Sequence, residues 1–205
     1  GEKPILEHTI NGFLHVPHTC QVIVATSPEY IPEVEKLFNR IEASSAIDFL
    51  AVEGGKERQY SIYNALQKVH PASNIVAVHD AVRPFIRPAL VERCCQIANE
   101  TGGAIIGVPA KDTIKKVKEG NIVEATPDRS KLWQAQTPQV FQKQLLLDAY
   151  EAAFEENFEG TDDASLVERI GGKVTMVEGD RENLKITFPI DLEVAELILA
   201  NWKYT

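Results

Sequence analysis

The chain has 205 residues, 44% hydrophobic and 25% charged, which is typical of a globular protein and excludes the disordered and fibrous classes. Thirty acidic residues against 21 basic ones give a formal charge of −9, so nucleic-acid backbones and anionic lipid surfaces should on average repel the protein. No apolar run approaches a bilayer span, and the first ten residues lack the features of a secretion signal. We therefore expect one cytoplasmic domain over residues 1–205, with no nucleic acid and no membrane partner.

Helical and strand periods alternate along the chain, which predicts an α/β fold. The predicted helices lie near residues 5–15, 31–42, 58–69, 88–100, 142–156, 162–169 and 190–202. The predicted strands cover residues 22–25, 49–52, 75–78, 104–108, 173–177 and 184–187. Several of these strands are apolar at nearly every position, which indicates burial on both faces. We therefore expect a mostly parallel sheet between two layers of helices, a three-layer sandwich.

One segment interrupts this alternation, at about residues 111–130. Two polar-rich stretches, 112–117 and 122–126, flank a turn at 118–121, which predicts a β-hairpin arm leaving the domain. Apolar side chains on an otherwise exposed arm usually need a partner surface, and a second copy of the chain is the simplest one. We therefore expect a homodimer through this arm; the alternative is a hairpin folded back on its own domain.

The three cysteines fit neither a disulfide framework nor a metal clip, because Cys94 and Cys95 are adjacent and Cys20 is alone. We interpret them as reduced packing residues. The common signatures of P-loop, dinucleotide-binding, zinc-protease and α/β-hydrolase proteins are also absent. What remains are polar clusters placed after predicted strands, where open parallel sheets bind their ligands.

Two clusters follow predicted strands directly. Gly54, Gly55 and Lys56 run into a helix that holds Ser61, where backbone amides could approach a phosphate or a base; the alternative is a plain glycine turn. Asp80, with Arg83 three residues later, could bind a metal, hydroxyls or phosphate, or could instead form an ion pair that fixes a loop.

Two further clusters flank the arm. The hydroxyls of Thr113 and Thr137, with the guanidinium of Arg129, could form a site for a phosphorylated polyol. The alternatives are a buried Trp133, a surface pair of Asp128 with Arg129, and a helix start at Thr137.

The last cluster lies near the end of the chain. Thr161 is the expected N-cap of the helix predicted at 162–169. Lys185 is a single cation in an apolar predicted strand, where an unpaired ammonium is costly, so it should have an anionic partner. The alternative is a Lys185 that faces solvent on an edge strand.

Taken in order, five segments resemble the 2-C-methyl-D-erythritol 4-phosphate cytidylyltransferase family over essentially the whole chain. They read HDAVRPF, VPAKDTIKKV, DRSKLWQAQTPQVF, GTDDASLVE and EGDRENLKITFPIDLEVAE, and GGKERQYSIYNAL matches a further family segment. The resemblance implies a Rossmann-like nucleotidyltransferase sandwich whose arm interlocks two subunits. It also implies a Mg²⁺-dependent reaction, in which a phosphate oxygen of methylerythritol phosphate attacks the α-phosphorus of CTP and pyrophosphate leaves.

The same resemblance implies roles for individual residues. Around the cytosine and ribose it places Gly55, Lys56, Ser61 and Ala81, with Asp80 at the junction of the two substrates. It makes Lys185, Asp80 and Arg129 the catalytic set, with Lys185 stabilising the α-phosphate. At the methylerythritol phosphate it places Arg83, Thr113, Arg129, Thr137 and Thr161, of which Thr113 and Arg129 come from the partner subunit's arm. No protein ligand for the metal ion is implied; the ion is expected to be bound mainly by the CTP phosphates.

The family pattern also includes a strand and a glycine-rich basic loop around the triphosphate, which would precede residue 1 of this chain. We expect triphosphate binding to be badly weakened without that loop. Three alternatives remain: a ribitol 5-phosphate cytidylyltransferase, a catalytically silent dimeric binding module, and a sugar-nucleotide glycosyltransferase. The last is disfavoured because the chain contains no D-x-D metal motif.

Overall fold

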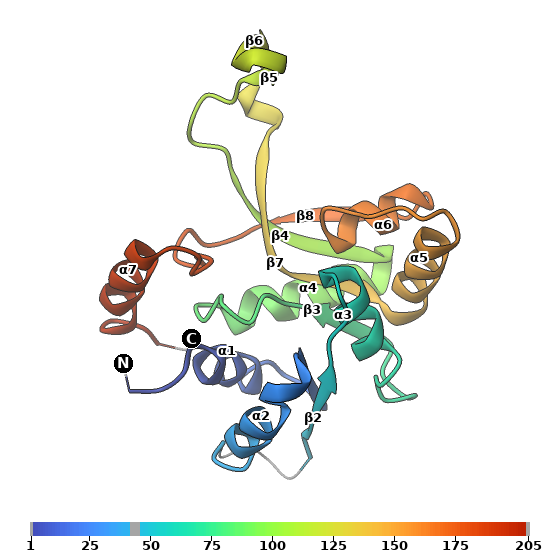
Figure 1. The fold of residues 1–205 in the computed structure, drawn as a ribbon, viewed down its shortest axis with the longest axis vertical. Coiled ribbons are helices and arrows are strands. Elements are labelled where there is room, and N and C mark those ends of the chain that lie inside the picture. Colours follow the sequence, from blue (N-terminus) through green and yellow to red (C-terminus); the bar gives the residue numbers. More distant parts are fainter. Residues whose placement is uncertain (1, 42–45, 204–205) are drawn as a thin grey trace.

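The computed structural model describes residues 2–41 and 46–203. The strands of these residues form two sheets and a separate hairpin (Figure 1). In the smaller sheet, β1 (Gln21–Thr26) pairs in parallel with β2 (Asp48–Glu53). The larger sheet has the order β3-β7-β4-β8. Its strands are β3 (Ile75–Val78), β7 (Trp133–Gln142), β4 (Gly103–Pro109) and β8 (Val174–Glu178). Strands β4 and β8 are parallel, whereas β7 runs antiparallel to both of its neighbours.

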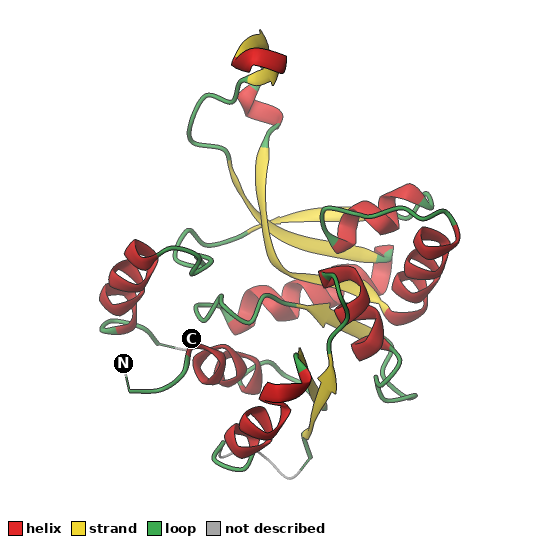
Figure 2. Cartoon of the chain, viewed as in Figure 1, coloured by secondary structure: helices red, strands yellow, loops and turns green. Residues whose placement is uncertain are grey.

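Helices surround these sheets, as the hydrophobic periodicity predicts (Figure 2). The α-helices of the described residues are α1 (Ile5–Leu14), α2 (Ile31–Phe38), α3 (Arg58–Leu66), α4 (Pro88–Thr101), α5 (Lys143–Glu155), α6 (Asp163–Arg169) and α7 (Pro189–Leu199). Short 3₁₀ turns are η1 (Pro28–Tyr30), η2 (Glu119–Asn121) and η3 (Arg129–Lys131). Each predicted helix corresponds to an observed one, and the α/β fold class is confirmed. Helix α2 ends earlier than predicted, and residue 42 of that prediction, like residues 1, 204 and 205 of the predicted domain, lies outside the described residues.

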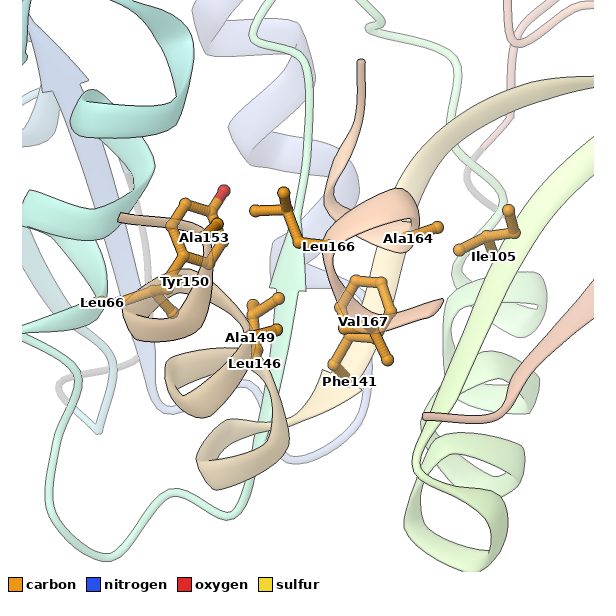
Figure 3. Packing of buried hydrophobic residues seen from close by; sticks show 10 residues of the cluster. All are labelled: Leu66, Ile105, Phe141, Leu146, Ala149, Tyr150, Ala153, Ala164, Leu166 and Val167. Atoms are coloured by element: carbon orange, nitrogen blue, oxygen red, sulfur yellow. The ribbon is translucent and has the colours of Figure 1, made fainter. Parts of the chain in front are cut away.

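The core divides into two layers because neighbouring residues of a strand point to opposite faces of the sheet. Ile106 and Val140 pack with Cys94 and Ala98 of α4 on one face. On the other face, Ile105 and Phe141 pack against α5, α6 and the end of α3 (Figure 3). The larger of the two clusters consists of Leu66, Ile105, Phe141, Leu146, Ala149, Tyr150, Ala153, Ala164, Leu166 and Val167. Helix α6 is thereby fixed beside the sheet, close to the candidate site.

Strand β7 is not among the predicted strands, and one predicted strand is wrong. Residues 184–187 form no strand; they run beside residues 80–83, where the backbone N–H of Ile186 donates to Val82 O at 2.9 Å. Residues 80–83 form an irregular loop and cannot offer the repeated hydrogen bonds of a β-ladder. Residues 184–187 therefore form no strand beside it. The helix start considered at Thr137 is also wrong, because Thr137 lies inside β7.

A proline within the central strand β7 is accommodated by an irregularity in the ladder. Pro138 follows a cis peptide bond, and the pairing of β7 with β4 shifts register between Ile105 and Gly107. Proline has no N–H to donate, so it fits only where the ladder is interrupted. The interruption lies beside Thr137, one of the candidate site residues.

The predicted arm is present and projects from the end of β4 and the start of β7 (Figure 1). Its strands are β5 (Lys116–Lys118) and β6 (Ile122–Ala125), shorter than predicted. Gly120 has φ 76°, a left-handed conformation that glycine adopts at no steric cost, and this turns the hairpin. The apolar side chains of the arm are exposed, among them Ile114, Val117, Ile122 and Val123.

Two further sequence expectations concern the cysteines and the membrane. All three thiols are free; Cys94 is in the core, whereas Cys20 is exposed and is not a packing residue. Among the described residues, no helix is both long enough and apolar enough to cross a bilayer.

Candidate active site

Three charged side chains meet at the carboxyl end of β3. Asp80 Oδ2 accepts a hydrogen bond from Arg83 Nε at 3.0 Å, and Lys185 Nζ lies 3.3 Å from the same oxygen. Asp80 and Arg83 are largely enclosed, whereas the Lys185 side chain is 47% exposed. Lys185 therefore has the anionic partner predicted for it, although it lies on a loop and not on a strand. The loop-fixing ion pair of Asp80 with Arg83 is also present.

The two cations keep Asp80 ionised. Burial by itself would raise the pKa of this carboxyl group, but the Arg83 hydrogen bond and the charge of Lys185 hold the pKa below its ordinary value. Three charged groups thus leave one net positive charge at the end of the strand. Such a site favours an anionic ligand.

Arg83 also joins the two chain segments of this cluster. Its Nη1 donates to the backbone oxygen of Asn183 at 2.8 Å, while its Nε is taken by Asp80. Guanidinium has five N–H donors, so donors remain for a phosphate. Asn183 is itself buried, and its Nδ2 donates to Thr137 O at 2.9 Å, which ties the segment before Lys185 to β7.

A histidine next to Asp80 fixes the hydroxyl of Thr137. His79 Nε2 lies 2.9 Å from the backbone oxygen of Arg83, which can only accept, so Nε2 carries the hydrogen. Burial lowers the pKa of His79 to about 4, so the ring is neutral at pH 7 and its Nδ1 is an acceptor. Thr137 Oγ1, 3.0 Å from this nitrogen, therefore donates to it and accepts from the Asp80 N–H. This arrangement leaves Thr137 no hydrogen for a phosphate, so its predicted substrate contact, which stays a prediction, needs the hydroxyl to turn away from His79.

The glycine segment lies between β2 and α3. The N–H of Gly55 donates to Ser61 Oγ at 2.9 Å, and Ser61 Oγ donates to Glu57 O. A Cβ at Gly55 would collide with Tyr60 Cβ, so only glycine fits this close to the helix. Lys56 is exposed beside it.

Thr161 lies at the start of α6, but it is not the helix cap. Asp162 is the N-cap: its Oδ1 accepts from Ser165 N at 2.9 Å, and Ser165 Oγ is 3.4 Å from Asp162 N. Thr161 is exposed and lines a cavity of about 410 Å³ together with Arg58, Gln59 and Asp162. Its hydroxyl is thus not needed by the helix end, contrary to the sequence prediction.

Arg58, the first residue of α3, contributes a cation to the lining of this cavity. Arg58 Nη2 donates to Asp163 Oδ2 at 2.6 Å. Burial alone would lower the pKa of Arg58, but the adjacent Asp163 carboxylate raises it above its ordinary value, and Asp80 adds to the rise.

Two predicted site residues lie apart from the others, on the arm. Thr113 and Arg129 are exposed, and Arg129 Nη1 donates to Lys111 O at 2.7 Å across the base of the arm. Asp128 accepts from Ser130 N and does not form the considered surface pair with Arg129 in any described contact. Trp133 is 38% exposed and is therefore not a core residue.

The structure thus brings Asp80, Arg83 and Lys185 into contact and places Thr137 against the Asp80 backbone. Ala81 is adjacent, with its carbonyl accepting from Thr9 Oγ1 at 2.8 Å. The residues that sequence reasoning missed are His79, Asn183, Arg58, Gln59 and Asp163. Each lies within one of the segments quoted in the sequence analysis, where it was assigned no role, and only the folded chain shows what it contacts.

Comparisons with known proteins agree with this fold. The family model described as IspD, 2-C-methyl-D-erythritol 4-phosphate cytidylyltransferase, matches residues 1–201. A relative of that name from Caldanaerobacter subterraneus subsp. tengcongensis is 46% identical over 203 residues, covering 96% of this chain and 86% of the relative. Another relative of that name, from Clostridioides difficile, is 43% identical over 201 residues, covering 97% of this chain and 82% of the relative.

Solved structures agree as well. A 4-diphosphocytidyl-2C-methyl-D-erythritol synthase from Anaerococcus prevotii superposes with a TM-score of 0.88 at 28% identity, over 98% of this chain and 87% of that one. The 2-C-methyl-D-erythritol 4-phosphate cytidylyltransferase from Thermus thermophilus superposes with a TM-score of 0.77 at 34% identity, over 98% of this chain and 91% of that one.

These matches, on an α/β sandwich with a basic cluster at its strand ends, define the protein as a nucleotidyltransferase. Nothing in the comparisons favours the ribitol 5-phosphate alternative. The chain belongs to the 2-C-methyl-D-erythritol 4-phosphate cytidylyltransferase family.

The buried neutral His79 makes a pH-dependent contribution to stability. Its pKa is about 4 in the folded chain against 6.5 when exposed, so below pH 6.5 the unfolded chain takes up a proton that the folded chain does not. Linkage then predicts that His79 costs the protein roughly 2 kcal/mol of unfolding free energy between pH 7 and pH 5. Urea denaturation of wild type and His79→Gln at both pH values measures this. The wild type should lose that much more stability than the variant; equal losses would contradict a neutral His79.

Proposed function

We propose that this protein transfers CMP from CTP to 2-C-methyl-D-erythritol 4-phosphate, releasing pyrophosphate. The observation that carries the proposal is the cluster of Asp80, Arg83 and Lys185 at the carboxyl end of β3. This edge of an open α/β sheet is where such folds bind ligands, and the net positive charge suits a reaction between two phosphates. Family membership supplies the two substrates.

The nucleotide would bind along the segment between β2 and α3. Ser61 Oγ accepts from Gly55 N and donates to Glu57 O, which leaves one lone pair that can accept from a base amine. Lys56 and the exposed Ala81 lie at the ends of strands β2 and β3, so both can face the same nucleotide.

The acceptor phosphate would bind where Arg83 keeps unused donors, with Thr161 and Thr137 as the further proposed contacts. Its oxygen forms a bond to the α-phosphorus of CTP, and the bond from that phosphorus to the pyrophosphate oxygen breaks. The chemistry requires positioning and neutralisation of the charge that gathers on phosphate oxygens, without a covalent enzyme intermediate.

Lys185 is the cation best placed to stabilise the negative charge that develops on the α-phosphate oxygens. Its side chain is the exposed member of the cluster, and its 3.3 Å contact with Asp80 is longer than the Arg83 hydrogen bond. Lys185 can therefore turn to an α-phosphate oxygen while Arg83 continues to compensate Asp80. Asp80 serves to hold both cations at the junction of the substrates.

Mg²⁺ is the proposed metal ion. In the described part of the chain no group of three or more His, Cys, Asp or Glu side chains could hold a metal, so the ion would take most of its oxygen ligands from the CTP phosphates. Asp80 is the one carboxylate of the contact cluster that could add a protein oxygen. The ion would supply charge neutralisation at the triphosphate.

We further propose that the protein works as a cytoplasmic homodimer without nucleic acid or membrane partners. The exposed apolar arm supports the dimer, and the charge of −9 disfavours anionic polymers and lipids. Thr113 and Arg129 would then complete the acceptor site of the partner subunit, which explains why they lie apart from Asp80 in their own chain.

Replacing Lys185 tests the proposed charge contact. Lys185→Ala should lower kcat by roughly 100-fold, as loss of one transition-state donor does in other enzymes. Pyrophosphate release from CTP and methylerythritol phosphate measures it, with Lys173→Ala, an exposed lysine before β8, as the matched control. Near-normal turnover of Lys185→Ala would remove this residue from the reaction.

Mixing two inactive variants tests the shared site. Arg129→Ala and Lys185→Ala carry their defects in different subunits of each proposed site, so a mixed dimer regains one intact site. After subunit exchange of an equal mixture, about one quarter of wild-type activity should return, because half the dimers are mixed and each has one of two sites intact. Absence of rescue, with exchange verified by mass spectrometry, would argue for sites built within one chain.

A further inference from the structure

The first two residues of α3 contact the loop that leads into α6, about 100 positions later in the sequence. Gln59 Nε2 donates to Phe158 O at 3.1 Å, and its Oε1 accepts from Gly160 N at 3.1 Å. Arg58 donates to Asp163 at the first residue of α6. We call these contacts of Arg58 and Gln59 the α3–α6 bridge.

Burial makes the bridge specific. Gln59 is 8% exposed and uses both ends of its amide, and Asp163 is fully buried between Arg58 and Tyr150 Oη. Buried polar groups are costly without partners, so alternative positions of this loop would leave several of them unsatisfied. Gly160 adds a steric constraint, since a Cβ there would lie 2.5 Å from Leu166 Cδ2.

A second support holds the same helix end from the sheet. Gln139 of β7 is 2% exposed; its Nε2 donates to Asp162 Oδ2 at 2.8 Å, and its Oε1 accepts from Ala164 N at 2.9 Å. Thr161 therefore lies between two sets of directed contacts, with its own side chain exposed on the cavity. Its position is fixed by neighbours on both sides.

We propose that Gln59, with Arg58, is a positioning residue that holds Thr161 at a fixed separation from the nucleotide segment at the start of α3. This inference rests on the proposed function, in which Gly55 and Ser61 contact the nucleotide and Thr161 contacts the acceptor phosphate. The bridge residues follow Gly55 by only three and four positions, so the segment that binds the nucleotide also sets the place of Thr161. Direct displacement needs the reacting atoms about 3–3.5 Å apart, so a small shift of Thr161 would cost productive geometry.

The test uses Gln59→Leu, which removes both hydrogen bonds at similar volume. The KM for methylerythritol phosphate should rise about fivefold to tenfold, because the bridge loses two hydrogen bonds, while the KM for CTP changes by less than about twofold. Gln142→Leu is the matched control, since Gln142 also donates from Nε2 to a backbone oxygen, that of Asn99, but away from this loop. It should leave both KM values unchanged.

A double-mutant cycle separates positioning from general support of the fold. If Gln59 acts through Thr161, then Gln59→Leu adds no further rise in acceptor KM to a Thr161→Ala variant. Rises that multiply, or a Gln59→Leu variant with a lowered Tm and an unchanged acceptor KM, would overturn the proposal. Arg58→Ala is the weaker test, because it leaves the buried Asp163 without its cation and destabilises the fold.

Hydrogen exchange provides a readout that needs no turnover. In the wild type, CTP with Mg²⁺ should slow exchange in the peptide covering residues 158–162, and Gln59→Leu should abolish that effect. If CTP binds but the exchange rates of these amides do not change, the α3–α6 bridge does not couple the nucleotide segment to the loop that carries Thr161, and the proposal fails. If CTP does not bind the naturally occurring protein at all, the proposed function fails, and this inference fails with it.

Discussion

One carboxylate shared by two cations is the constraint on which the candidate site depends. Asp80 is largely enclosed, so its charge needs compensation, and Arg83 supplies it from inside the same loop. Arg83 in turn binds the backbone of Asn183, which fixes the segment that carries Lys185. A single negative charge thus orders two segments that lie about 100 residues apart. Because Arg83 is enclosed and Lys185 is exposed, the second cation can leave Asp80 for a substrate without exposing an uncompensated charge.

The central strand β7 provides the fixed frame for these loops. Gln136, Thr137 and Gln139 are buried polar residues on it, and they bond respectively to the loop after β8, to His79 and to the start of α6. Buried amides and hydroxyls bond in only a few geometries, so each one specifies the position of a loop. The interruption at Pro138 frees this part of the strand from its ladder with β4. The cluster around Asp80 is therefore built on the sheet.

Local sequence pattern was sufficient for the helices and for the apolar strands, since their periodicity is visible within each segment. It missed β7, because Pro138 and four glutamines obscure a strand that is defined by its neighbours on both sides. It was wrong for residues 184–187, where alternating Leu184, Lys185 and Ile186 look like a strand but lie beside a loop. Asp80, Arg83 and Lys185 could be predicted from their places and charges. The contacts of His79 with Thr137 and of Gln59 with the loop before α6 could not, because those partners are distant in sequence.

The most direct test of the central claim is pyrophosphate release from CTP and Mg²⁺ by the naturally occurring protein, with methylerythritol 4-phosphate and ribitol 5-phosphate supplied in separate reactions. Membership of the methylerythritol phosphate cytidylyltransferase family predicts release with that acceptor alone. Release with ribitol 5-phosphate alone, or with neither acceptor, would contradict the proposed reaction.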